Sequence, residues 1–144
     1  MNSPYRREQS AGYLTNHAAR LFVRAIERRI EGGMAGPMPV FFALMESEAL
    51  PQKELAKWAA VEQPTMANTL ARMSRDGLVE STPDPGDKRS SLIRLTALGR
   101  KRATAALAAA QETNALALSG FTAKEREVYF DLLQRVIATL GADA

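Results

Sequence analysis

The spacing of apolar side chains predicts three helices before residue 60. Near the N-terminus apolar residues recur at steps of three and four positions and charged residues fill the other face, as in an amphipathic helix of about 20 residues. These apolar residues are Leu14, Ala18, Leu21, Phe22, Ala25 and Ile26. Gly32-Gly33 is expected to end the helix, and Gly36-Pro37 marks a loop. The apolar run 40–45 predicts a second, mostly buried helix, and Pro51 begins a third.

A fourth helix and a β-hairpin follow these segments. The helix is expected to begin at Gln63-Pro64 and to end at Gly77. Proline is favoured at the first helical position because the N–H that it lacks would have no partner within the helix. Its apolar stripe consists of Met66, Leu70 and Met73. Two short strands are expected over 78–82 and 91–95, around a turn at Asp84-Pro85-Gly86-Asp87.

Two longer helices complete the chain. Thr96 can cap an alanine-rich helix that runs to about Leu118, where Ser119-Gly120 breaks it. The sequence Thr-Ala-Lys-Glu at 122–125 fits a capping box, in which the threonine and glutamate side chains each bind a backbone N–H of the first turn. The apolar face of the last helix consists of Val128, Leu132, Leu133, Val136, Ile137 and Leu140.

The order of these elements predicts the fold class. Residues 37–96 read helix–helix–helix–hairpin, which is the order of a winged helix-turn-helix unit. The flanking segments 10–31 and 97–141 carry apolar stripes that need a partner. We therefore expect a mainly α fold with a small β-hairpin wing, composed of a winged helix-turn-helix domain and a flanking helical region.

Composition excludes several kinds of site. The 144 residues contain no cysteine and a single histidine, His17, so thiolate metal sites, disulfides, thiol nucleophiles and His-rich metal sites are excluded. No Gly-rich phosphate loop, Ser-His-Asp set or paired-carboxylate signature is present, which argues against an enzyme. No cofactor and no metal are expected. The polar N-terminus and the absence of a long apolar run predict a cytoplasmic protein without membrane contact.

Positive charge is concentrated in the middle of the chain. Residues 53–102 hold ten basic and six acidic side chains, a net charge of +4, whereas residues 103–144 hold three basic and five acidic ones, a net charge of −2. A local basic excess suits a phosphate-binding surface. An ordinary solvated surface is an equally good explanation of charge alone.

The polar face of the fourth helix favours DNA recognition. It carries short hydrogen-bonding side chains near its start and arginines further along, whereas an ordinary solvent face carries Glu–Lys pairs. These residues are Thr65, Asn68, Thr69, Arg72 and Arg75. The hairpin tip adds Lys88 and Arg89, which can reach an adjacent minor groove. Asp87 can hold the Arg89 guanidinium by paired hydrogen bonds, although a loop ion pair without a function explains it as well.

Several stretches together resemble the MarR family of winged-helix transcriptional regulators. The resemblance rests on L-A-K at 55–57, Q-P-T-M-A-N-T-L-A-R-M at 63–73, D-G-L-V-E at 76–80, P-D-P-G-D-K-R-S at 83–90 and L-T-A-L-G at 95–99. It implies that Gln63, Thr65, Asn68, Thr69 and Arg72 read the major groove of DNA. It also implies that Arg89 enters the minor groove, that Asp87 orients Arg89, and that the outer helices form a homodimer. Ser81 stands where the family usually has arginine.

The resemblance further implies a small, often aromatic or anionic, ligand bound between the dimer helices and the DNA-binding part. The residues that could line such a pocket are Tyr13, His17, Arg20, Phe41, Phe42, Met45 and Trp58. A plain core role for the two phenylalanines and Met45, and a surface or dimer-interface role for His17, are the ordinary alternatives.

These observations predict a sequence-specific DNA-binding regulator. We expect a homodimer that binds a double-stranded, pseudo-palindromic operator through helices about 34 Å apart, and that acts as a repressor released by a ligand. The alternative is a winged helix used only for protein–protein contact, which would not need the basic residues on the fourth helix and the hairpin tip.

Overall fold

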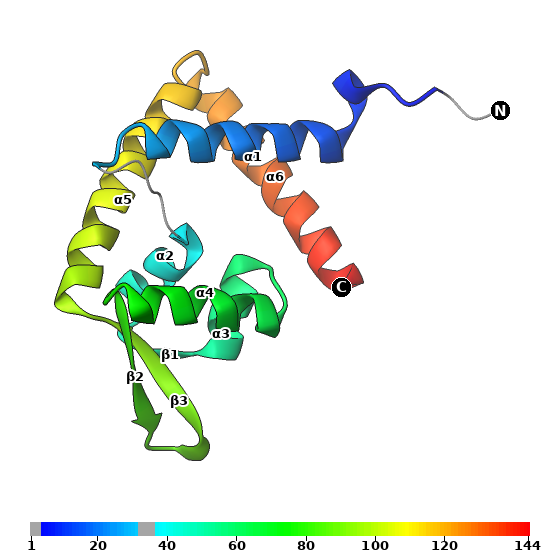
Figure 1. Cartoon of the computed structure of the whole chain (residues 1–144). Helices are drawn as coiled ribbons and strands as arrows, with labels where there is room; N and C mark the ends of the chain where they lie inside the picture. The colour runs from blue at the N-terminus through cyan, green and yellow to red at the C-terminus, as the bar shows by residue number, and fades with distance from the viewer. Residues whose placement is uncertain (1–3, 32–36) are drawn as a thin grey trace. The chain divides into compact units, whose positions relative to one another are not determined.

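A computed structural model describes residues 4–31 and 37–144. Two short elements and six helices appear in the order shown in Figure 1, with a hairpin between the fourth and fifth helices. The bounds are η1 Arg7–Gln9, α1 Ala11–Glu27, α2 Met38–Glu46, β1 Leu50–Pro51, α3 Gln52–Ala59, α4 Gln63–Arg75, β2 Val79–Asp84, β3 Asp87–Leu95, α5 Ala97–Ala117 and α6 Ala123–Asp143. The chain divides into two compact units, one up to Ala110 and one from Gln111 onward.

The predicted helices are present, with two differences at their ends. Ser10 caps α1 by accepting a hydrogen bond from the Tyr13 N–H at 3.2 Å, and the helix ends at Glu27. It therefore stops before Gly32-Gly33, and the predicted glycine stop and the loop mark at Gly36 lie outside the described residues. Helix α4 starts at Gln63, which makes Pro64 its second residue rather than its first.

The sheet has three strands, where the sequence predicted only a hairpin. The strand order is β1-β3-β2 and all pairs are antiparallel, with Leu50 opposite Ile93 and Val79 opposite Leu95. Both hairpin strands extend to the turn at Pro85-Gly86, further than predicted. Strand β1 was not predicted, because two residues are too few to show the alternation of apolar and polar side chains that indicates a strand.

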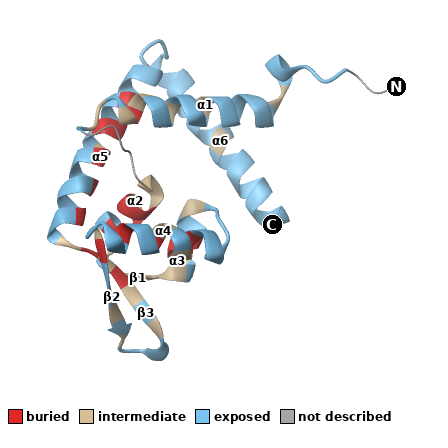
Figure 2. Cartoon of the chain, viewed as in Figure 1, coloured by how far each residue is buried: buried red, intermediate tan, exposed pale blue. Residues whose placement is uncertain are grey.

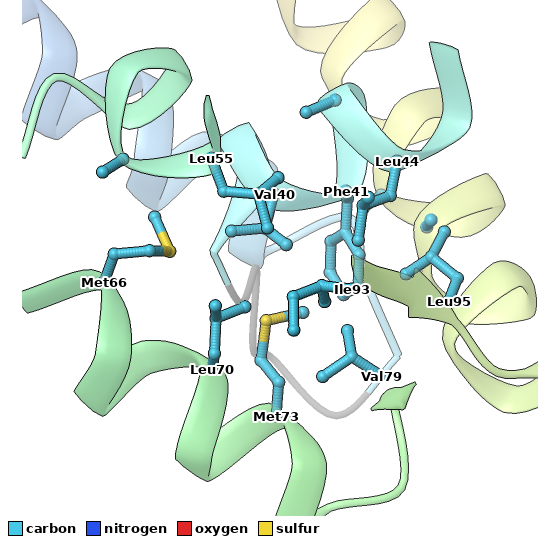
Figure 3. Packing of buried hydrophobic residues seen from close by; sticks show 14 residues of the cluster. Val40, Phe41, Leu44, Leu55, Met66, Leu70, Met73, Val79, Ile93 and Leu95 are labelled. Carbon is cyan, nitrogen blue, oxygen red and sulfur yellow. The ribbon is translucent and has the colours of Figure 1, made fainter. Parts of the chain in front are cut away.

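One core holds the helix-turn-helix segment and the sheet together. The buried stripe of α4 meets α2, α3 and the inner face of the hairpin, and Figure 3 shows these side chains converging. Leu44, Leu55, Met66 and Val40 are its largest fully buried side chains. As Figure 2 shows, burial is concentrated here while the hairpin tip stays exposed. The core therefore fixes which face of α4 points outward.

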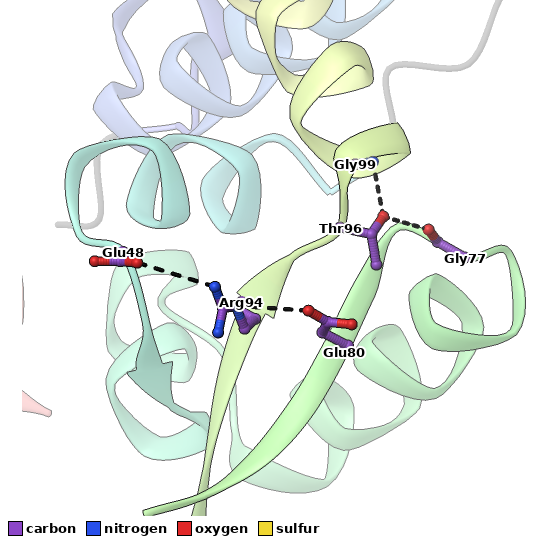
Figure 4. Close-up of polar contacts among 6 residues, drawn as sticks. All are labelled: Glu48, Gly77, Glu80, Arg94, Thr96 and Gly99. Carbon is purple, nitrogen blue, oxygen red and sulfur yellow. Dashed lines mark hydrogen bonds and ion pairs between the residues drawn. The ribbon is translucent and has the colours of Figure 1, made fainter.

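A hydrogen-bonded joint connects α4 to α5 (Figure 4). The Thr96 hydroxyl donates to the Gly77 carbonyl and accepts from the Gly99 N–H at 3.0 Å. Gly77 has a φ of +75°, which favours glycine. A Cβ on Gly99 would lie 1.8 Å from the Leu78 carbonyl oxygen, so only glycine fits this approach. The predicted Thr96 cap is confirmed, and the joint sets the start of α5 against the end of α4.

Helix α6 begins with the predicted capping box. The Thr122 side chain accepts from the Glu125 N–H at 3.1 Å, and the Glu125 carboxylate accepts from the Thr122 N–H at 2.9 Å. No residue of α6 is buried. Its exposed large apolar side chains are Val128, Phe130, Leu132, Val136, Ile137 and Leu140.

Candidate nucleic-acid interface and an adjoining cavity

The outward face of α4 carries the predicted recognition residues. Gln63, Thr65, Asn68, Arg72 and Arg75 are exposed and Thr69 is half-buried. The face is set by the core, because Met66, Leu70 and Met73 hold the opposite side of the helix. The Thr69 hydroxyl donates to the Thr65 carbonyl at 3.1 Å, so its oxygen remains available only as an acceptor.

The two arginines of α4 differ in their ion pairs. The Arg75 Nε lies 3.6 Å from an oxygen of the adjacent Asp76, with both side chains more than half exposed. Such an exposed pair contributes about 0–1 kcal/mol and leaves Arg75 free to exchange partners. Arg72 forms no ion pair within residues 4–31 and 37–144.

The hairpin tip is fixed by two aspartates that bind its backbone. Asp84 accepts from the Gly86 N–H at 2.9 Å, and Asp87 accepts from the Arg89 N–H at 2.9 Å. The sequence suggested instead that Asp87 binds the Arg89 guanidinium. Because its carboxylate binds the backbone, it positions the tip and leaves the guanidinium unpaired among the described side chains. Lys88 and Arg89 are both exposed.

Arg94 connects the three strands at the base of the hairpin, a contact that the sequence analysis missed. Its Nε lies 3.6 Å from Glu80 on the neighbouring strand, and an Nη lies 3.9 Å from Glu48, just before β1 (Figure 4). Ser81, which stands where the resemblance described above predicts arginine, is exposed and pairs opposite Ile93. The only signal that could have predicted the Arg94–Glu80 pair is the register of the hairpin strands, which places Glu80 opposite Arg94.

The residues predicted to form an effector pocket lie in different environments. Tyr13 and His17 are exposed and stack on α1, with ring centroids 5.8 Å apart, and Arg20 is also exposed. Phe41 is part of the core, Phe42 is half-buried, and Met45 and Trp58 are exposed. A pocket role for this set stays a prediction. Phe41 alone among them lines the cavity described next.

A cavity of about 560 Å³ lies behind the C-terminal half of α4. Helices α2, α4 and α5 line it, together with the residues that follow α1 and α4. Its apolar lining residues are Ile30, Pro37, Phe41, Met73, Leu78 and Ala106. Its polar lining residues are Thr69, Arg72, Arg75, Asp76 and Arg102. Among the described lining residues, three guanidinium groups therefore share one concave site with one carboxylate. We call it the α4–α5 cavity.

The described parts of the chain hold neither a cluster of metal-ligating side chains nor a membrane-spanning helix. No group of three or more His, Cys, Asp or Glu side chains is placed to hold a metal ion. No helix there is long and apolar enough to cross a membrane.

Curated relatives of the chain are transcriptional regulators. The HTH-type transcriptional repressor NicR of Pseudomonas putida is 33% identical over 95 residues, which are 66% of this chain and 60% of NicR. The transcriptional regulator HosA of Escherichia coli is 31% identical over 98 residues, which are 68% of this chain and 73% of HosA. The chain thus spans less than two thirds of NicR and almost three quarters of HosA.

Solved structures share the fold over nearly the whole chain. The PcaV regulator of Streptomyces coelicolor, solved with its natural ligand, has a TM-score of 0.82 and 25% identity, and the match covers 95% of this chain and 98% of PcaV. A MarR variant of Escherichia coli, solved with operator DNA, has a TM-score of 0.80 and 22% identity. The match covers 94% of this chain and 99% of the MarR variant. These neighbours confirm the predicted winged helix-turn-helix architecture.

A family model described as the MarR family matches residues 40–91, which run from α2 into β3. The HosA match adds identity above 30% over more than two thirds of that regulator. The chain belongs to the MarR family of transcriptional regulators.

Proposed function

We propose that this regulator binds a specific DNA operator as a homodimer, represses transcription there and is released by a small ligand. Residues 37–96 form the DNA-binding domain in this proposal, and 10–31 with 97–141 form the dimerisation region. The observation that carries the proposal is the outward face of α4, where an exposed row of hydrogen-bonding and cationic side chains is held in place by a buried stripe.

In the proposed complex α4 lies in the major groove. Gln63, Thr65 and Asn68 stand in its first two turns, where a recognition helix meets base edges. Amide and hydroxyl groups can donate to and accept from bases. Arg72 and Arg75, further along, meet either a base or the phosphate backbone.

The hairpin tip supplies a second contact. The exposed Arg89 and Lys88 stand on a turn whose backbone is held by Asp84 and Asp87. A fixed turn lowers the entropy cost of placing an arginine in the narrow, negative minor groove. Asp87 therefore acts as a positioning residue through the backbone, and Arg89 makes the contact.

A second copy of the chain is the proposed partner of the exposed apolar side chains on α1 and α6. Leu14 and Leu21, two turns apart on one face of α1, are each close to half exposed, as are several apolar side chains on α6. Contiguous exposed apolar surface on a soluble protein marks an interaction site. Two copies would place two recognition helices about one DNA turn apart.

The ligand part of the proposal is supported by its relatives. PcaV was solved with its natural ligand, and NicR is named a repressor. In this chain the α4–α5 cavity and the stacked Tyr13–His17 pair are two places where a small molecule could bind.

Selection from random duplex DNA at several salt concentrations tests the proposal. We expect a two-fold-symmetric motif with half-sites about one turn apart, and affinity that falls steeply with salt. Arg89→Ala should weaken binding and reduce the slope of log K against log salt by about one. Arg6→Ala, at an exposed arginine outside both proposed regions, is the matched control and should change neither. Tight binding without a motif would indicate a nonspecific DNA binder, and no binding at low salt would favour the protein-interaction alternative.

A further inference from the structure

The outer part of the hairpin has no core of its own. The buried residues of its two strands are Val79, Ile93 and Leu95, which all lie at its base. Residues 80–92 are all described by the structure, and none of them is buried. Strand β1 adds only two residues to the sheet, and these pair with Leu92 and Ile93. The direction in which the hairpin leaves the domain is therefore set at its base.

Arg94 connects all three strands at that base. It lies on β3, the central strand of the sheet. Its Nε is 3.6 Å from a Glu80 oxygen on β2, and an Nη is 3.9 Å from a Glu48 oxygen just before β1 (Figure 4). The Arg94 side chain is 42% exposed, against 72% for Arg75 in its pair with Asp76. An exposed ion pair contributes little alone, whereas several charges in one network can contribute more.

The charges around Arg94 argue against a direct contact with DNA. Arg94, Glu48 and Glu80, which we call the Arg94 cluster, carry two negative charges and one positive charge. A net negative surface repels a phosphate backbone, and the one guanidinium is already shared between two carboxylates. Its removal would leave two unneutralised carboxylates on either side of β3, and like charges repel each other. The cluster is therefore suited to holding the strands together.

A small change of direction at the base becomes a large displacement at the tip. Arg89 lies five residues before Arg94 on β3, a distance of up to about 17 Å at roughly 3.3 Å per residue. A tilt of about 10° at the base would then move Arg89 by about 3 Å. Such a movement breaks a hydrogen bond, in which donor and acceptor lie about 2.7–3.2 Å apart. The position of Arg89 relative to α4 therefore depends on the contacts of Arg94.

From this geometry we propose that Arg94 is a positioning residue for DNA binding. It holds β2 and the segment before β1 to β3, and so directs the hairpin such that Arg89 and the outward face of α4 reach one duplex together. Arg94 acts through Arg89 and does not itself contact DNA. This role rests on the function proposed above and extends it to a residue outside the recognition helix and the hairpin tip.

Distances between spin labels test the positioning without DNA. The chain contains no cysteine, so Lys88→Cys at the tip and Lys53→Cys at the start of α3 provide two unique labelling sites, both exposed. Labelled chains are diluted with unlabelled ones, so that each measured pair lies within one copy. Double electron–electron resonance should give a narrow distance distribution for this pair. Arg94→Gln should shift or broaden the distribution, whereas Arg94→Lys, which keeps the charge, should stay close to the wild type.

A double-mutant cycle tests the role of Arg94 in DNA binding. With the duplex recovered by selection, Arg94→Gln should weaken binding by about three- to tenfold, and by no more than Arg89→Ala does. In the Arg89→Ala background the same change should cost less than about twofold, because Arg94 then has no contact left to position. Arg7→Gln is the matched control, since it removes an exposed ion pair with Glu8 outside both proposed regions and should leave the affinity unchanged. Thermal unfolding checks the fold of each variant.

Two results would overturn the proposal. One is a distance distribution that Arg94→Gln leaves unchanged. The other is an equal loss of affinity from Arg94→Gln with and without Arg89, which would make Arg94 a direct DNA contact. A wild type that binds no duplex would instead be a failure of the proposed function, and the distance measurement, which contains no DNA, distinguishes the two failures.

Discussion

Helices α4 and α6 both carry a regular apolar stripe, but only that of α4 is covered by its own chain. Met66, Leu70 and Met73 of α4 are 2%, 6% and 2% exposed, whereas Ile137 and Leu140 of α6 are 62% and 64% exposed. The orientation of α4, and with it the outward face, is determined within the unit that ends at Ala110. Under the proposed function, a second copy of the chain covers the apolar face of α6. The covered stripe of α4 orients the proposed DNA-binding face, and the exposed stripe of α6 forms the proposed dimer interface.

Replacing one leucine in each helix should give the largest difference between α4 and α6 in the free energy of unfolding. Leu70→Ala removes a buried side chain and should lower the free energy of unfolding by about 2–5 kcal/mol. Leu140→Ala removes a side chain that is exposed within one copy, and at a protein concentration too low for self-association it should change the free energy of unfolding by less than about 0.5 kcal/mol. Urea unfolding followed by circular dichroism at 222 nm reports on the helices of both units, and the fluorescence of Trp58, the single tryptophan, reports on the first unit alone. Equal losses for the two variants would contradict the comparison.

A charge placed on the apolar face of α6 tests whether a second copy covers that face. Val136→Glu should weaken self-association by at least about a hundredfold, because an unpaired charge buried at an interface costs roughly 3–5 kcal/mol and each 1.4 kcal/mol is a factor of about ten. Ala138→Glu is the control, since two residues at 100° per residue turn it away from Val136. Sedimentation equilibrium measures the dimer dissociation constants of both variants and of the wild type. If wild type is monomeric at micromolar concentration, the dimer proposal is wrong.

Replacing one glycine at the joint between α4 and α5 and one on α6 compares a crowded backbone position with an open one. Gly99→Ala brings a methyl group onto the Leu78 carbonyl oxygen and should destabilise the protein by about 1–3 kcal/mol. Gly141→Ala meets no atom within 4 Å and should be neutral or stabilise by up to about 1 kcal/mol. Thermal unfolding measures both. A neutral Gly99→Ala would show that the joint is looser than its hydrogen bonds indicate.

The smallest expected effect concerns the capping box of α6. Thr122→Ala removes the acceptor for the Glu125 N–H and should cost about 1 kcal/mol. Thr139→Ala is the matched control, because its hydroxyl donates only to the Arg135 carbonyl inside the helix and its removal should cost nothing. Circular dichroism at 222 nm during heating separates the two. Identical melting curves would mean that the box contributes nothing to α6.

The features that depend on residues close together in the sequence could be predicted from it. The stripe of α4, the Thr96 cap and the 122–125 capping box each depend on residues a few positions apart, and the structure confirms them. The end of α3 had no such signal, because Ala60 adopts the left-handed conformation with a φ of 54°, where glycine is expected.

Contacts between distant segments could not be predicted in this way. Arg94 meets Glu48 only because β1 joins the sheet, and Arg102 and Arg72 line one cavity only because the joint at Thr96 sets α5 against α4. Asp87 shows the limit at short range as well. Its spacing from Arg89 suits either a guanidinium or a backbone bond, and the turn geometry selects the backbone.

The number of chains on one operator tests the central claim most directly. Native mass spectrometry of the protein with a selected duplex should show two chains per duplex, since two outward α4 faces and one shared apolar interface require it. Val136→Glu should abolish that species at the same concentration, while Ala138→Glu should retain it. A single wild-type chain bound with full affinity would contradict the account, because α4 would then act without a partner for α6.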